Sequence, residues 1–535
     1  MSSYDWILQF GPTPTIICYI CFIRSRIRNF LPHPLMVAFS PQILLLALPL
    51  LSCVNANAVI RRAPPKANNV IVQLFEWPWE SVAAECTNIL GPFGYGYAQV
   101  SPAMEHITGN QWWTDYQPVS YLLTSKRGTR AQYANMVSTC AAAGVGIIQD
   151  VVMNHMSAGS GVGFAGSSYT KYSYPAVPYT SSNFHYCAGN GEAAGVTDLN
   201  NVTNVRFCEL DGLADLAQEQ PAVQKALTAY LQDLVSLGVA GFRVDAAAYM
   251  EPSNLSAIYS ALSKSTYRTQ EVYDGGASDP AMYDTIGDVI EFGATSYVMQ
   301  AFLGTSGTFM TTVSNLVTPV PMNTAWDLIP SNVANFIMAN QDTERSSPGD
   351  SLNYLSPNNA YVLGAIFMLG FNYGTPTVYS GYNHSTYDIG APQAANGNTN
   401  PVTCFANGWR CEQEWTAIAN MVLYHNAVGS AALTNVFVGT EQQVAFGRGS
   451  IGFLVINNQG STWTATFKTS LPAGTYCDIM YVSPSLPHSP ANLPSHDTDT
   501  APKTCSGPSY VVSSSGQFTA SVGAFDALAL LSGFA

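Results

Sequence analysis

The feature that most constrains the fold is an alternation of short apolar runs with segments of helical periodicity, which begins near Val70. Repeated β-α units of this kind build parallel sheets, because each crossover between parallel strands needs a helix-length connection. Eight runs are candidate strands: 71–75, 97–100, 145–151, 241–245, 269–273, 289–292, 336–338 and 375–379. The sequence therefore predicts an α/β fold built on a (β/α)8 TIM barrel.

The 535 residues exceed the roughly 250 that a barrel commonly takes, so further folded units are expected. Residues 154–206 are rich in Gly, Ser, Tyr and Asn and lack helical periodicity, which indicates an inserted small domain B after the third strand. From about residue 435 the pattern changes to alternating stretches such as 452–456, 462–467 and 527–531. We therefore expect the barrel in two parts, 68–153 and 207–434, domain B at 154–206, and an antiparallel β-sandwich at 435–535.

The N-terminus carries the pattern of a secretory signal. An apolar run at 43–51 precedes Ala56-Asn-Ala58, an A-x-A-type cleavage site. The run is shorter than the roughly 20 residues of a spanning helix, which favours a cleaved leader over a membrane anchor. We expect residues 1–58 to be a leader, with Met36 as an alternative start, and 59–67 to be a propeptide or linker. The mature protein is then secreted and extracellular, without a membrane partner.

The charge argues against a polyanionic ligand. The formal net charge is −14, with only 20 Lys and Arg, whereas binding of nucleic acid needs clustered cations. We therefore expect no nucleic-acid partner, and we expect a monomer.

The eleven cysteines fit an oxidising compartment. Three of them, Cys18, Cys21 and Cys53, fall in the expected leader, which leaves eight that can all pair. No C-x-x-C pair occurs in the mature part, so a thiolate metal site is disfavoured. Sequons at Asn201, Asn254 and Asn383 agree with secretion and glycosylation.

Three acidic residues stand at the carboxyl ends of expected barrel strands, where the βα loops of this architecture open the active site. They are Asp245, Glu271 and Asp342. A retaining glycoside hydrolase needs two carboxyls about 5 to 5.5 Å apart, one ionised and one protonated. Asp245 shares a strand face with Arg243 and should stay ionised, whereas Glu271 has uncharged neighbours in sequence and can hold a proton.

Four stretches resemble the short motifs of the α-amylase family, glycoside hydrolase family 13: 150–155, 241–245, 271–273 and 340–342. The resemblance implies that Asp245 is the nucleophile, that Glu271 is the general acid/base, and that Asp342 grips sugar hydroxyls and stabilises the transition state. It also implies that Arg243 orients the nucleophile and that His155 hydrogen-bonds the sugar in the central subsite. The implied substrates are starch and other α-1,4-glucans.

Further residues match the family in loops between the motifs. The stretch 111–120 resembles the family's aromatic loop, in which Tyr116 stacks on the central glucose and Trp112 and Trp113 line neighbouring subsites. The resemblance extends the substrate-binding set to Gln117, Tyr249 and Gln341.

The family's calcium segment resembles residues 206–216. The resemblance implies that Ca²⁺ is held by Asn154, the Asp215 carboxylate and the carbonyls of Arg206 and Tyr249, all of them the oxygen donors that this ion prefers.

The cysteines fall where animal-type members have theirs. This implies four disulfides: Cys86–Cys140, Cys187–Cys208, Cys404–Cys411 and Cys477–Cys505.

The chain departs from the family pattern at three places. Gln341 replaces the usual His of the fourth motif, and Ala248-Tyr249 replaces a frequent Lys-His pair on the leaving-group side. Thr377 stands where chloride-activated members carry a basic residue, so we expect activity that does not depend on chloride.

Two alternatives remain at this stage. The chain could be a transglycosidase or an oligosaccharide-specific glucosidase of the same family, or a non-catalytic carbohydrate-binding homologue. The second alternative is disfavoured because all three carboxylates are present.

Overall fold

The computed structural model describes residues 68–187, 194–304, 312–318, 321–322, 327–345, 350–481 and 507–533. The expected leader 1–58, the segment 59–67 and Cys505 lie outside these residues. Within the described ranges, no helix is long and apolar enough to cross a bilayer.

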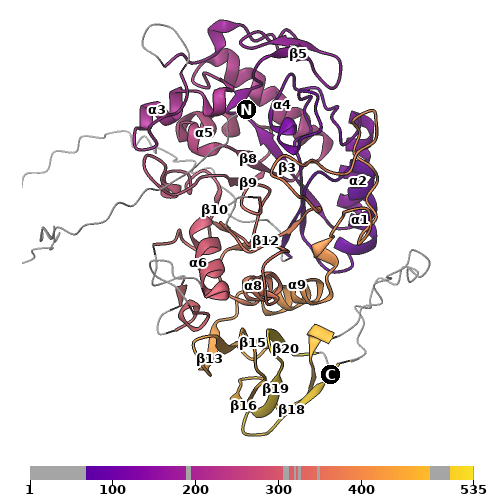
Figure 1. Ribbon diagram of the computed structural model, residues 1–535, viewed down its shortest axis with the longest axis vertical. Coiled ribbons are helices and arrows are strands. Elements are labelled where there is room, and N and C mark those ends of the chain that lie inside the picture. The colour runs from indigo at the N-terminus through magenta and orange to yellow at the C-terminus, as the bar shows by residue number, and fades with distance from the viewer. Residues whose placement is uncertain are drawn as a thin grey trace, which may run out of the picture. The chain divides into compact units, whose positions relative to one another are not determined.

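Eight parallel strands close into a barrel in the order β1-β12-β11-β10-β9-β8-β3-β2 (Figure 1). Ile71 of β1 pairs with Tyr97 of β2 on one side and with Thr377 of β12 on the other, which closes the ring. The strands are β1 (Ile71–Leu74), β2 (Tyr97–Val100), β3 (Gly146–Val152), β8 (Gly241–Asp245), β9 (Tyr267–Gln270), β10 (Asp288–Ile290), β11 (Ala334–Ile337) and β12 (Thr375–Ser380). The predicted barrel is confirmed, with all eight strands in the expected order along the chain.

The limits of three strands differ from the sequence prediction, and the reason is their buried polar residues. Strand β9 begins two residues before the predicted 269, and it contributes Arg268, Thr269 and Gln270 to the buried interior. Strands β10 and β11 likewise begin early, with buried Asp288 and Asn335. Apolar periodicity cannot detect a strand whose buried residues are polar.

Helices on the outside of the barrel begin and end at recognisable signals. Thr129 caps α2 through a capping box with Gln132. Helix α4 starts at Pro221, whose ring is preset for the first turn, and ends before Gly238, which adopts a left-handed φ of 105°. The helices are α1 (Trp79–Glu85), α2 (Arg130–Ala142), α3 (Val202–Phe207), α4 (Pro221–Leu237), α5 (Pro252–Ser260), α6 (Phe292–Leu303), α8 (Ala360–Gly370) and α9 (Thr416–Val428).

A layer of large side chains closes the amino-terminal end of the barrel. Ile71, Tyr97, Ile148 and Tyr267 form a separate apolar cluster, in which the two tyrosine rings stack with centroids 6.3 Å apart. This layer seals that end of the barrel, and active sites of this architecture lie at the opposite, carboxyl-terminal end.

Among the described residues after β3 the strands are short: β4 (His155–Met156), β5 (Ser160–Val162), β6 (Ser168–Thr170) and, further along, β7 (Ala214–Asp215). Strand β4 pairs with β7, and α3 runs across residue 206, where the expected domain B ends. The domain limits given from the sequence remain predictions.

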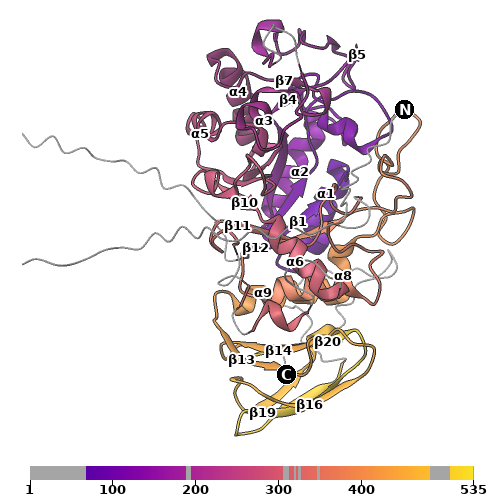
Figure 2. The same cartoon turned by 60° about the vertical axis from the view of Figure 1, so that its left-hand side comes forward.

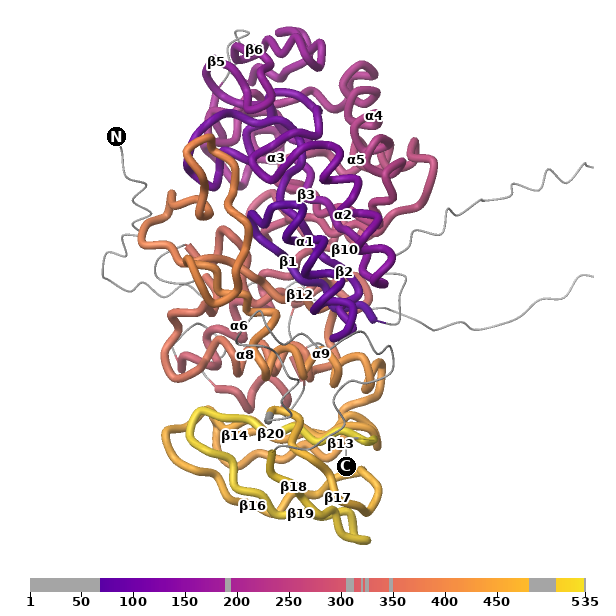
Figure 3. The backbone as a smooth tube through the Cα atoms, turned by 90° about the vertical axis from the view of Figure 1, so that its right-hand side faces the viewer, coloured from indigo at the N-terminus to yellow at the C-terminus, as the bar shows by residue number. Residues whose placement is uncertain are grey.

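The C-terminal part is an antiparallel β-domain, as predicted (Figures 2 and 3). One sheet has the order β13-β14-β15-β20, and the pair β16-β19 packs against it through a shared core that contains Phe453, Phe467 and Phe518. The strands are β13 (Leu433–Val438), β14 (Gln443–Arg448), β15 (Gly452–Asn457), β16 (Trp463–Lys468), β17 (Gly474–Cys477), β18 (Ser509–Val512), β19 (Gln517–Val522) and β20 (Asp526–Leu531).

Three of the four implied disulfides are present. They join Cys86 to Cys140, Cys187 to Cys208 and Cys404 to Cys411. The fourth involves Cys505, outside the described residues.

Candidate active site

The three acidic residues lie at the carboxyl rim of the barrel. Asp245 is the last residue of β8, Glu271 directly follows β9, and Asp342 lies in the loop after β11. Because parallel strands end at the same edge, all three side chains belong to the face on which βα loops meet.

One buried arginine connects the carboxylates. Arg243, which is 1% exposed, places Nη1 2.6 Å from Asp245 Oδ1 and 2.9 Å from Asp150 Oδ1. Its Nη2 lies 2.6 Å from Glu271 Oε1. The expected contact with Asp245 is present, but the guanidinium is shared, so Arg243 also favours the ionised form of Glu271 and opposes the proton that the sequence led us to expect there.

Two opposing effects set the protonation of these carboxyls: burial favours the protonated forms, and the charge of Arg243 favours the ionised forms. Burial raises the pKa of Asp245 and of Glu271, and Arg243 opposes both shifts. Burial and the charges of Glu271 and Asp245 raise the pKa of Asp342 to about 8. Several carboxyls that compete for one guanidinium titrate as a unit, so the group retains a proton near neutral pH. Such a proton is what a general acid requires.

The backbone after Asp245 is strained in a way that serves Glu271. Ala246 has a left-handed φ of 49°, and its N–H donates to Glu271 Oε2 at 2.8 Å. A non-glycine residue in this region costs of order 1 kcal/mol or more and typically persists where function requires it. Each oxygen of Glu271 thus has a donor from the protein.

The aromatic loop lies beside the carboxylates on the 3₁₀ turn 112–116. Tyr116 donates its hydroxyl proton to Asp150 Oδ2 at 2.9 Å, and its ring meets Trp112 edge-on with centroids 5.9 Å apart. Trp113 is more exposed and donates from Nε1 to Asp388 Oδ1 at 2.8 Å. The loop therefore presents aromatic surface next to the acidic group.

Two residues at this site were missed by sequence reasoning about roles. The sequence assigned Asp150 only to the first motif, yet its carboxylate accepts hydrogen bonds from both Arg243 and Tyr116. Tyr387, half exposed in the loop after β12, packs edge-on against Trp112 at 5.6 Å and accepts the Trp112 Nε1–H at its carbonyl. No periodicity marks that loop, and only the folded chain brings it to the aromatic residues.

Other predicted substrate-binding residues are held by protein partners. His155 Nε2 lies 3.0 Å from the Tyr116 carbonyl, and burial lowers the pKa of His155 to about 4, so its ring is neutral at pH 7. Gln341 Oε1 accepts from Gln73 Nε2 at 2.8 Å, and Gln117 Oε1 accepts from the backbone of the segment after β4. A sugar hydroxyl would have to join or replace these bonds.

The residues expected to hold calcium come from neighbouring elements. Asn154 Oδ1 is buried without a hydrogen-bond partner, and the Asn154 carbonyl accepts from the backbone of Leu216, next to buried Asp215. Arg206 on α3 and Tyr249 on the 3₁₀ turn 247–249 belong to elements that pack together. An orphaned buried amide oxygen beside a buried carboxylate fits a hard cation. One Asp215 oxygen already meets His185 Nδ1 at 2.7 Å.

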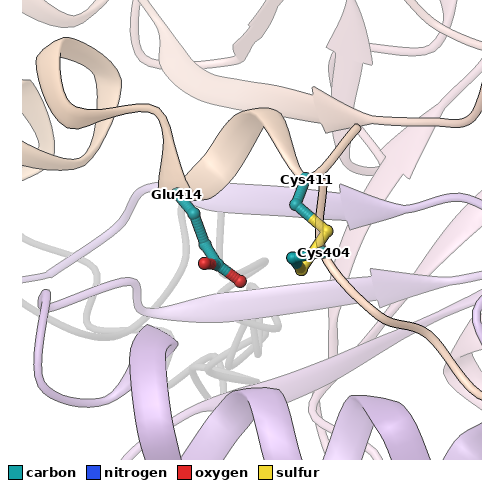
Figure 4. A group of neighbouring side chains, drawn as sticks. All are labelled: Cys404, Cys411 and Glu414. Carbon is teal, nitrogen blue, oxygen red and sulfur yellow. A yellow bond between two sulfur atoms is a disulfide. The ribbon is translucent and has the colours of Figure 1, made fainter. Parts of the chain in front are cut away.

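A separate cavity of about 670 Å³ lies beside α1, and none of its lining residues is a predicted site residue. Cys404 and Glu414 line this cavity, and Cys411 lies next to both of them (Figure 4). The two sulfurs form a disulfide, so they are not thiolates and this group is not a metal site.

Comparisons with known proteins agree with this geometry. Residues 101–268 match the family model described as alpha amylase, catalytic domain, and residues 438–531 match alpha amylase, C-terminal all-beta domain. An α-amylase of Streptomyces violaceus is 38% identical over 480 residues, which cover 89% of this chain and 76% of that relative. The chain belongs to the α-amylase family, glycoside hydrolase family 13. An α-amylase of Thermomonospora curvata is 40% identical over 88% of this chain and 74% of its own length.

Solved α-amylase structures agree with the assignment. Wild-type α-amylase I of Eisenia fetida is 32% identical, has a TM-score of 0.77, and covers 86% of this chain and 97% of its own. A mutant of that protein in a maltohexaose complex has a TM-score of 0.78. The present protein is thus an α-amylase, and the identity and coverage span both the barrel and the β-domain.

Proposed function

We propose that this α-amylase hydrolyses internal α-1,4-glucosidic bonds of starch, glycogen and related maltooligosaccharides with retention of configuration. The observation that carries the proposal is the contact of one guanidinium, Arg243, with both Asp245 and Glu271. Ligation by the two ends of one planar group is compatible with the spacing of about 5 to 5.5 Å that retention requires. The relatives named above support the glucan substrate.

In the first step Asp245 attacks the anomeric carbon, and the glycosidic bond breaks as its oxygen takes the proton of Glu271. Arg243 keeps Asp245 aligned and ionised for this attack. A covalent glycosyl ester on Asp245 results, and the shortened glucan leaves.

In the second step the Glu271 carboxylate takes a proton from water. The water oxygen attacks the same anomeric carbon, and the bond to Asp245 breaks. Two inversions return the α configuration. Asp342 grips the sugar hydroxyls, and in its ionised form it stabilises the positive charge of both transition states.

Substrate is held by the aromatic loop. Sugar rings present faces of C–H groups, for which an aromatic plane is a suitable surface. Tyr116 is assigned to the central glucose, and Trp112 and Trp113 to neighbouring units. His155, Gln117, Tyr249 and Gln341 supply hydrogen bonds to hydroxyls.

Asn154, Asp215 and the carbonyls of Arg206 and Tyr249 would hold Ca²⁺, and the orphaned Asn154 Oδ1 supports this set. When bound, the ion supplies a crosslink between the segment after β3 and the barrel. It takes no part in bond cleavage.

The protein is further proposed to be secreted, monomeric and glycosylated, without a nucleic-acid or membrane partner. The disulfides among described residues support an oxidising compartment. Of the sequons, Asn201 and Asn383 are exposed, whereas Asn254 on α5 is half buried.

Soluble-starch digestion by the purified mature chain tests the proposal. Endo-action predicts rapid loss of iodine staining while little reducing sugar has formed, and maltooligosaccharide products. E271Q should abolish hydrolysis and keep the thermal unfolding midpoint, since Gln cannot donate the proton. E80Q, at an exposed position in the first turn of α1, is the matched control and should retain activity. Release of glucose alone, or full activity of E271Q, would contradict the proposal.

A further inference from the structure

Arg345 lies in the loop after β11, three residues beyond Asp342, and is enclosed by aromatic rings. Its guanidinium carbon is 5.2 Å from the ring centroid of Phe75, 5.6 Å from that of Trp112 and 5.2 Å from that of Tyr382. These rings follow β1, β2 and β12, respectively. One cation therefore connects four loops of the carboxyl rim.

The hydrogen bonds of Arg345 reach the backbone that carries Asp342. Its Nη1 donates to the Gln341 carbonyl at 3.0 Å and to Glu344 Oε1 at 3.1 Å. The backbone N–H of Arg345 donates to the Asp342 carbonyl at 3.1 Å. Its Nε and Nη2 are buried without a hydrogen-bond partner. Only part of the guanidinium is thus used by hydrogen bonds, and the rest faces the rings, an arrangement that stabilises a cation.

The charge of Arg345 also acts on Asp342. Burial, Glu271 and Asp245 raise the pKa of Asp342, whereas Arg243 and Arg345 lower it. The charged and titratable groups around Arg345 itself are Glu344, Tyr379 and Tyr382, and Glu344 is shared with Arg410 at 2.7 Å and lies 3.8 Å from His384 Nδ1. Arg345 is thus the second cation beside an acidic group that otherwise depends on Arg243.

We propose that Arg345 is a positioning residue that holds the loop bearing Asp342 and the Trp112 ring in one arrangement. The inference rests on the proposed function, because it assumes that Asp342 acts on a glucan. Arg345 itself need not touch the sugar. A planar guanidinium suits this place, since it can stack on rings and donate at its edge, which an ammonium cannot do.

The test compares R345M, R345K and R410M by the pH dependence of kcat/KM on maltoheptaose and by thermal unfolding. R345M should lower kcat/KM by about tenfold or more, because small misplacements of catalytic groups are costly. It should also shift the acidic limb of the pH profile of kcat/KM to higher pH by about half a unit, because Asp342 loses a cation that favours its ionised form. R345K should keep the acidic limb near that of the wild type, since the charge is restored. Its KM should still be higher than that of the wild type, since the ring contacts are not restored.

R410M is the matched control. Arg410 is buried in the same network, 3.9 Å from the ring centroid of Tyr354 and bonded to Glu412, but it contacts neither the Gln341 carbonyl nor Trp112. It should lower the unfolding midpoint and leave the acidic limb in place.

Three results would overturn the inference. They are a loss of thermal stability in R345M with an unchanged limb and KM, a limb in R345K shifted as far as in R345M, and a wild-type KM in R345K. If R345M does not fold, R345K alone decides. Wild-type hydrolysis of maltoheptaose, measured in the same series, separates failure of this inference from failure of the proposed function.

Discussion

At the residue scale, Thr377 determines what can bind behind the carboxylates. It is 1% exposed, and its Oγ1 accepts the Asn335 Nδ2–H at 2.7 Å. The cation that a bound anion would need is absent at this position, and Arg243 is already surrounded by Asp150, Asp245 and Glu271. A further anion would add repulsion.

Activity is therefore expected to be independent of chloride. Addition of chloride to dialysed enzyme, with nitrate as the control for ionic strength, should change kcat by less than about twofold, because Thr377 offers the anion no positive charge. A manyfold rise with chloride alone would contradict this.

A second prediction concerns Glu414, which lies against Glu85 beside the cavity near α1. Burial raises the pKa of Glu414 to about 7 and that of Glu85 well above its usual range. The protonated form is thus favoured in the folded state, and its stabilisation is present below the unfolded pKa and lost as pH rises through about 7. E414Q keeps a neutral side chain at all pH values. Between pH 5 and pH 8 the unfolding free energy of the wild type should decrease. The decrease in E414Q should be smaller by about 1 to 3 kcal/mol.

Calorimetry at the two pH values measures this difference. E80Q, an exposed Glu to Gln change on the same helix as Glu85, should behave like the wild type. An equal loss of stability in E414Q and wild type would show that the Glu85–Glu414 pair is not the cause.

The sequence was informative for residues in motifs and silent for residues that act through space. Asp245, Glu271 and Asp342 could be found because they follow strands in a recognisable order. The contact of Arg243 with Glu271 could not be found, because the two residues lie 28 positions apart and no sequence pattern links them. Tyr387 and Arg345 likewise gain their position only from the packing of loops.

At the scale of elements, the aromatic loop is held from beneath by buried charges. Asp115 belongs to the same turn as Trp112, Trp113 and Tyr116, and its side chain is fully buried. Its Oδ2 lies 2.9 Å from Arg127 Nη2. Arg127 also pairs with Glu76 at 2.7 Å. The loops after β1 and β2 are thus joined below the surface that is assigned to sugar.

We predict that D115N lowers stability by about 3 to 5 kcal/mol, because it leaves buried Arg127 with one anion instead of two. The loop that carries Trp112 and Tyr116 then loses its anchor, so KM for maltooligosaccharides should rise more than kcat falls. Urea unfolding and steady-state kinetics measure both effects.

D233N is the control, since Asp233 pairs with Arg130 on the exposed surface and should cost at most about 1 kcal/mol. Similar losses in the two variants would contradict a structural role of the Asp115 anchor.

The elements themselves were largely predictable. Strands in which most of the buried residues are apolar, such as β1 and β2, were located within one residue, and β8, β15, β16 and β20 likewise. Strands β9, β10 and β11 were displaced, because they carry buried polar residues such as Thr269, Gln270 and Asn335. The short elements after β3 have no periodicity that could have located them.

At the scale of the whole molecule, calcium is expected to join the segment after β3 to the barrel. Chelation should lower the thermal unfolding midpoint, since an ion that binds only the folded state at 1,000 times its dissociation constant adds about 4 kcal/mol. Calcium should restore the midpoint. D215N removes a proposed ligand and should unfold at the chelated midpoint with or without the ion, whereas D233N should respond to chelation like the wild type. Loss of stability on chelation in D215N would exclude Asp215 as a ligand.

The central claim is that Asp245 and Glu271 cleave α-1,4-glucosidic bonds through a covalent intermediate. The most direct measurement is time-resolved proton NMR of fresh products from maltoheptaose, recorded before mutarotation. The account predicts that the α-anomer of the new reducing end appears first and decays toward the equilibrium mixture. Initial appearance of the β-anomer would mean single displacement by water, and would contradict the nucleophilic role assigned to Asp245.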